Sequence, residues 1–232
     1  MLPPSQSDLL EHVLASRPPR LVQDRAWLVM FYSITLGSNT SEALTTKLSS
    51  NLWHTFNDVR LLLEPKVPVI QALIILACYA EEFMTPSICG MLISKACMMF
   101  QAIDMTHSRL DAATRDMRNM LFWRLNTLDK SLALILCRRP VFAPEMATGT
   151  PLPPLEQLLL SPPTYSAGDV PTLFNAHYIH QMHLMSNIMA DVWNCLYGRD
   201  SHKVREVTEN LEKWYRQATE VNTKHIIHLY TL

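Results

Sequence analysis

The sequence predicts an all-α fold, an irregular bundle of about eight helices with one long proline-rich crossover. Long stretches carry apolar residues at steps of three and four, the period of helices that bury one face. No Asn-Gly or Asp-Gly turn separates alternating runs, so the signals of β-hairpins are missing. Eight of the 15 prolines fall between positions 140 and 171, which concentrates helix-breaking residues in one stretch.

Six helices are predicted before the crossover. The first follows Ser5 or Ser7 and ends at Pro18, and the others span about 24–37, 42–62, 67–83, 86–104 and 111–137. The polar residues 38–41 supply an N-cap for the third helix, and Pro65 and Pro68 separate it from the fourth. Thr85 followed by Pro86 is typical of an N-cap with proline at the first helical position.

The crossover spans 138–170 and is predicted to pack against the helices, because four leucines (155, 158, 159 and 160) lie inside it. A seventh helix begins at Pro171 or Thr172 and ends at Gly198, and an eighth follows Ser201. We therefore expect a single helical domain, 1–232, with a first group of helices in 1–137 and a second in 171–232. The apolar helical pattern is unfinished at Tyr230, so we expect the domain to be incomplete at its C-terminus.

Composition limits the kinds of function. Only 18% of residues are charged, below the roughly 25% of ordinary soluble domains, and 48% are hydrophobic, with 13 methionines. This pattern indicates either a large core or a surface covered by protein or ligand. A net charge of −1 offers no excess of cations for a phosphate backbone, so DNA binding by this chain alone is not expected. The most apolar run, 67–80, is too short for a membrane span, and no membrane partner is predicted.

Neither a metal site nor an enzyme active site is predicted. The five cysteines are spaced by 11, 8, 40 and 58 residues, whereas structural zinc needs close ligand pairs. His177, His180 and His183 share one helix, but the outer two point about 120° apart and cannot reach one ion together. Glycine-rich phosphate loops and clustered acids are also missing. The thiols of Cys97 and Cys137 are interpreted as inert packing on apolar helices.

The stretch from Arg118 to Pro140 combines unusual features. Two bulky aromatics, Phe122 and Trp123, stand side by side, and Asp129-Lys130 interrupts an otherwise apolar helix. Arg138-Arg139-Pro140 then provides cations for the last carbonyls and a proline that stops the helix. From the residues alone this is a core helix with a strong C-terminal stop.

This stretch resembles the middle homology region of fungal binuclear zinc-cluster transcription factors. That family has an aromatic-Trp pair, then Leu-Asp-Arg or Leu-Asp-Lys, then Gly-Arg-Pro. The positions that carry the resemblance are Gln71, His107, Phe122, Trp123, Leu128, Asp129, Lys130, Arg139 and Pro140. Arg138 replaces the family's glycine at a helix end where φ > 0 is common, so the local turn is expected to differ. The resemblance covers most of the chain, without the zinc-cluster module.

The resemblance implies a nuclear (or cytoplasmic) regulatory domain that modulates transcriptional activation through a small-molecule effector or a protein partner. The partners it implies are transcriptional co-regulators or a full-length family member, with DNA contacted only through a module absent from this sequence. The resemblance implies zinc only in such an upstream cluster, and it implies no cofactor in this chain. We expect an effector beside Met99, Phe122 and Trp123, or else core packing there, and a structural ion pair or cap at Asp129 and Arg139. The alternative is a non-DNA-binding scaffold that pairs with a full-length regulator; a helical enzyme is less favoured.

Overall fold

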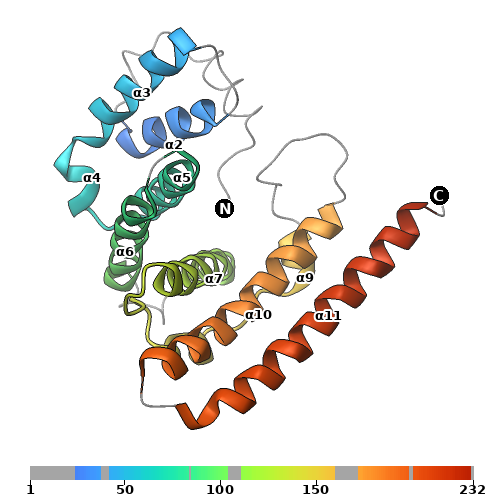
Figure 1. Cartoon of the computed structure of the whole chain (residues 1–232). Helices are drawn as coiled ribbons and strands as arrows, with labels where there is room; N and C mark the ends of the chain where they lie inside the picture. Colours follow the sequence, from blue (N-terminus) through green and yellow to red (C-terminus); the bar gives the residue numbers. More distant parts are fainter. Residues whose placement is uncertain are drawn as a thin grey trace. The chain divides into compact units, whose positions relative to one another are not determined.

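The computed structural model describes residues 24–37, 42–83, 85–103, 111–159, 172–198 and 201–230. These ranges hold ten α-helices, one short 3-10 helix and no strand, which confirms the all-α prediction (Figure 1). The chain divides into two compact units between Asp111 and Ala112. The first predicted helix, after Ser5 or Ser7, lies outside the described residues.

Five helices form the first unit: α2 (Arg25–Leu36), α3 (Glu42–Phe56), α4 (Val59–Leu63), α5 (Val67–Phe83) and α6 (Pro86–Ile103). Helix α5 contacts both α2 and α6, and α2 also contacts α3. Its residues between Val69 and Ala77 are buried on nearly every side, which confirms the prediction of a buried core helix at 67–80. Helix α2 begins at a side-chain cap, because the Asp24 carboxylate accepts the N–H groups of Ala26 at 3.0 Å and Trp27 at 3.2 Å.

The prediction of one helix over 42–62 is wrong. Helix α3 ends at Phe56, and α4 begins at Val59 after the pair Asn57-Asp58. Asn and Asp favour non-helical backbone because their side chains compete for backbone hydrogen bonds. The Asp58 N–H turns back to the Thr55 carbonyl at 3.4 Å, and its own carbonyl accepts the Leu61 N–H at 3.0 Å. The apolar period continues through the break and therefore concealed it.

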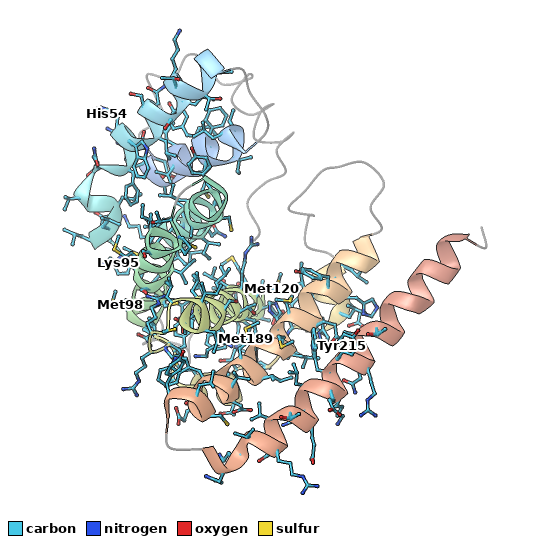
Figure 2. All side chains as sticks on the ribbon, viewed as in Figure 1. His54, Lys95, Met98, Met120, Met189 and Tyr215 are labelled. Carbon is cyan, nitrogen blue, oxygen red and sulfur yellow. The ribbon has the colours of Figure 1, made fainter. Side chains whose placement is uncertain are left out.

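Helix α6 is long and apolar enough, by length and composition, to cross a bilayer. It packs along α5, and its buried residues cover one half of its circumference, from Cys89 to Phe100. Met91 and Met98 on the opposite face are exposed, and Figure 2 labels Met98 with Lys95 beside it. The core helix of a globular unit shows the same one-sided burial.

The second unit contains α7 (Ala112–Ile135), α8 (Pro144–Gly149), α9 (Leu155–Leu159), α10 (Thr172–Tyr197), the 3-10 helix η3 (Ser201–Lys203) and α11 (Val204–Tyr230). Helix α10 is its centre, with contacts to α7, α8, α9, η3 and α11. It ends at Tyr197 and is followed by Gly198, where any Cβ atom would collide with the Asn194 carbonyl oxygen. Glycine is required there by close approach to the last helical turn.

The crossover differs from its predicted form. Its described part holds two short helices, α8 and α9, and Leu158 of α9 is buried while α9 packs on α10. Pro144 at the first position of α8 starts a helix instead of breaking one. These two helices and the split of α3 from α4 raise the number above the expected eight. Helix α7 packs on α10 within the second unit, whereas the sequence grouped residues 1–137 together.

Candidate functional site

The family-like motif lies on α7, which ends in a hydrogen-bonded reversal. The Arg138 N–H bonds to the Ala133 carbonyl at 3.0 Å, and the Cys137 N–H bonds to the Leu134 carbonyl at 3.4 Å. This is the Schellman pattern, in which one residue adopts a left-handed backbone. Cys137 is that residue, with φ of 51°. Arg138 stands at the family's glycine position, where a different local turn was expected, and the left-handed residue lies one position earlier. Cys137, interpreted as inert packing, is exposed.

Asp129 holds the chain that emerges from this reversal. Its Oδ1 accepts the Val141 N–H and its Oδ2 accepts the Phe142 N–H, both at 3.0 Å. The Asp129 side chain is fully buried. A buried carboxylate is tolerated when hydrogen bonds satisfy its oxygens, and here two backbone donors do so. Asp129 therefore holds the backbone of residues 141–142, which belongs to no helix.

Lys130 completes the contact from the next position. Its Nζ donates to the Phe142 carbonyl and lies 3.6 Å from Asp129 Oδ2, and its side chain is only 2% exposed. The ion pair of Asp129 is thus with Lys130, while Arg139 is exposed. Removing an ion pair from water costs free energy, and that cost is offset only when further hydrogen bonds satisfy the buried charges. The backbone of 141–142 supplies these hydrogen bonds. We call Asp129, Lys130 and this backbone the crossover clamp.

The aromatic pair, about two turns earlier on α7, contacts the same crossover. The rings of Phe122 and Phe142 lie 5.2 Å apart between centroids, and Phe122 meets Trp123 edge-on at 5.5 Å. Trp123 Nε1 donates to the Pro151 carbonyl at 2.9 Å. Both aromatic side chains are buried, at 1% and 3% exposure. They therefore bind the described crossover to α7 together with the clamp.

A polar seam joins α7 to α10 on another face. Asn126 donates to Ser186 Oγ at 2.9 Å, and Ser186 donates to the His183 carbonyl at 2.6 Å. The Nδ1 atom of His183 lies 3.1 Å from Thr127 Oγ1, and its ring lies 6.0 Å from that of Trp123. Burial, and secondarily the charges of His180 and Arg124, lowers the pKa of His183 to about 4. His183 is therefore neutral at physiological pH.

The structure places the remaining predicted residues as follows. Met99 is buried on α6 of the first unit, whereas Phe122 and Trp123 belong to the second. Gln71 is half-buried on α5, Leu128 half-buried on α7, and Pro140 half-buried after it; His107 lies outside the described residues. The clamp thus unites Asp129 and Lys130 directly, with the aromatic pair beside them. Effector binding at Met99, Phe122 and Trp123 stays a prediction.

A surface hollow of about 420 Å³ lies elsewhere, along α11. Its lining residues all come from this one helix: Leu211, Glu212, Trp214, Tyr215 and Arg216. Trp214 Nε1 donates to the Gln181 carbonyl at 3.0 Å, which fixes α11 on α10. Tyr215, labelled in Figure 2, is 65% exposed. Among the residues that the structure describes, no group of three His, Cys, Asp or Glu side chains could hold a metal ion.

Sequence reasoning missed the partners of the motif. Val141 and Phe142 contribute backbone groups, which leave no residue-type signature, although Phe142 is an apolar residue just past a proline. Asn126, Ser186 and His183 were also missed as a set. Their one available signal was polar residues at helical spacing on two otherwise apolar helices.

An all-helical fold thus packs the aromatic-Trp pair and the buried Asp129-Lys130 pair, residues that resemble the regulatory region of fungal transcription factors, against the following crossover. The chain belongs to this family: the model of the fungal-specific transcription factor domain matches residues 21–222. No zinc-cluster domain is found in the sequence. The resemblance inferred from residues 118–140 is thereby confirmed.

Two relatives carry names of the same kind. A transcriptional regulator of Claviceps purpurea is 58% identical over 215 residues, 90% of this chain and 35% of that protein. An uncharacterized transcriptional regulatory protein of Schizosaccharomyces pombe is 29% identical over 128 residues, 51% of this chain and 20% of that protein. The chain therefore spans about a third or less of each relative's length. No solved structure matches it significantly.

Proposed function

We propose that this chain is the regulatory domain of a fungal transcriptional regulator and modulates transcriptional activation by binding a ligand or a protein partner in the nucleus. The observation that carries the proposal is the family match over residues 21–222. With a net charge of −1, the chain relies on a separate module to contact DNA. It acts by binding and has no enzymatic activity.

An effector acts on such a domain by favouring one of two arrangements. Phe122 and Trp123 support the proposal of an effector position there, because both touch the segment that the clamp holds. A ligand that inserted beside them would change how the crossover packs on α7. The binding would be detected as a rise in the melting temperature of the purified chain with a metabolite library.

A reporter assay tests the regulatory function. The chain would be fused to a heterologous zinc-cluster DNA-binding module and expressed in a fungus with a matching reporter gene. We expect the fusion to change transcription relative to the module alone, because the domain recruits or restrains the transcription machinery. Output equal to that of the module alone, with both proteins present at the same level, would contradict the proposal.

The second candidate is a scaffold that pairs with a full-length regulator. The low net charge and the wide cysteine spacing favour it, since neither provides for DNA contact within this sequence. Recovery of a zinc-cluster protein with the tagged chain from the native host would favour the scaffold. A purified monomer stabilised by a metabolite would favour the effector-responsive domain.

A further inference from the structure

The side-chain contacts between α7 and α10 advance in the same direction along both helices. Thr127 lies 3.1 Å from the His183 ring, and Ser131, one turn later, donates to the Met189 sulfur at 3.8 Å. Because both contacts advance toward the C-terminal ends, the two helices are parallel. Figure 2 labels Met189 within this seam.

Large apolar side chains at the end of the seam are exposed. Ile135 lies four residues after Ser131 on the same face of α7, and it is 61% exposed. Leu196 lies seven residues after Met189 on the same face of α10, and it is 64% exposed. These faces are covered by the opposite helix earlier in the seam, but α7 ends at Ile135 and α10 ends at Tyr197. These two apolar side chains therefore lie exposed where both helices end.

Further contacts bring more apolar groups to this end of the unit. The Tyr197 hydroxyl, on a side chain that is half exposed, donates to Cys137 Sγ at 3.1 Å and so joins the ends of α7 and α10. The 3-10 helix η3 contacts both α10 and α11, and Val204 follows it with 53% exposure. We call Ile135, Leu196, Tyr197 and Val204 the seam-end patch.

Cationic side chains border the seam-end patch. Arg139 lies just past the end of α7, and Lys203 and Arg205 flank Val204; all three are exposed. Glu206 is also exposed in that first turn of α11, and Glu209 binds Arg205 at 3.0 Å one turn later. Among the described residues of this border, three cations face two acids, and one of each binds the other, although the whole chain has a net charge of −1.

We propose that the seam-end patch binds an acidic helical segment of a partner protein. An apolar centre with a polar border is the general anatomy of protein interfaces, and the sign of the border selects the charge of the partner. Apolar residues on one face of that segment cover Ile135 and Leu196, and its carboxylates meet Arg139 and Lys203. This inference rests on the proposed function, for which it supplies the partner surface.

A synthetic peptide pair tests the predicted chemistry. One peptide of about 18 residues carries leucine along one helical face and glutamate elsewhere, and its match carries lysine at each glutamate position. Fluorescence anisotropy with the full chain should show at least about tenfold tighter binding of the glutamate peptide. The preference should shrink as salt is added. Equal binding of both peptides, or none of the glutamate peptide at about 1 mM, would overturn the proposal.

Two matched variants locate the binding. Ile135→Glu should weaken binding of the glutamate peptide by about tenfold or more, while Met91→Glu on α6 should change it by less than about twofold. Met91 is the matched control because it is 66% exposed, close to the value of Ile135, so neither change should disturb folding. Equal losses in both variants would overturn the proposal. So would a dimer of the chain that Ile135→Glu dissociates, since a second copy would then be the occupant.

The peptide assay and the reporter assay test the docking surface and the regulatory function independently. A chain that binds the glutamate peptide at the seam-end patch but leaves the reporter unchanged contradicts the regulatory function alone. A chain that changes the reporter but shows no charge preference in peptide binding contradicts the docking surface alone.

Discussion

Asp129 holds Phe142, thirteen residues further along the chain, by accepting its backbone N–H on a fully buried carboxylate at 3.0 Å. The contact explains why an acidic residue interrupts the apolar face of α7. It also gives the family's Leu-Asp-Lys motif a physical role, because Lys130 binds the carbonyl of the same residue. The motif therefore fixes the path of the crossover after its helix.

Asp129→Asn should lower the free energy of unfolding by about 2–4 kcal/mol. The amide keeps the shape of the side chain, but one of its two acceptors becomes a donor facing a backbone N–H, and Lys130 loses its counter-charge in a buried place. Chemical denaturation followed by tryptophan fluorescence measures the change. Asp116→Asn, an exposed position on α7, is the control and should stay within about 0.5 kcal/mol of the parent.

Cys137→Gly should stabilise the chain by about 0.5–1 kcal/mol. The left-handed backbone at Cys137 is strained for a residue with a Cβ atom, and glycine relieves that strain at some entropic cost. Cys137→Ala keeps the Cβ atom and loses the Tyr197 contact, so it should give no stabilisation. The pair is compared by denaturant midpoint; a more stable alanine variant would show that the backbone is not the cause.

His183 should make the chain less stable in acid. Its folded pKa of about 4 lies below the unfolded value near 6.5, so the unfolded chain binds more protons between these limits. The free energy of unfolding attributable to this residue is complete above pH 6.5 and falls by about 2–4 kcal/mol toward pH 4. It is read as the difference in pH dependence between the parent and His183→Gln. His202→Gln, at an exposed histidine, should leave the pH profile unchanged.

Trp123→Phe should loosen the crossover selectively. The change removes the hydrogen bond to the Pro151 carbonyl, worth about 1 kcal/mol, and leaves most of the ring packing in place. Hydrogen exchange should speed up in residues 144–159. The comparison is Trp214→Phe, which breaks the bond to the Gln181 carbonyl and should speed exchange in α11 instead. Identical exchange patterns in the two variants would contradict the assignment.

Local signals predicted most of the helices. The proline at position 86 and the long apolar period of 111–137 each mark an element that the structure contains at nearly the same bounds. The break at Asn57-Asp58 was not predicted, because the apolar spacing continues through it. The sequence indicated only that the turn at Arg138 differs from the family's, and the hydrogen bonds of the last turn put the left-handed residue at Cys137.

The site was predictable only in part, because its contacts are distant along the chain. The aromatic pair and Asp129-Lys130 stood out as residue types, yet their partners are backbone groups 12 to 28 residues later. Backbone N–H and carbonyl groups are the same in every residue, so no pattern in the sequence marks them. The neutral state of His183 likewise follows from burial between α7 and α10, which periodicity does not show.

The central claim is that Asp129 clamps the crossover to α7, and amide hydrogen exchange at Val141 and Phe142 tests it most directly. In the parent chain these two amides should exchange only when the second unit unfolds, because both are bound to the buried carboxylate. In Asp129→Asn at least one of them should lose that protection. Exchange in the parent as fast as in an unstructured peptide would contradict the account.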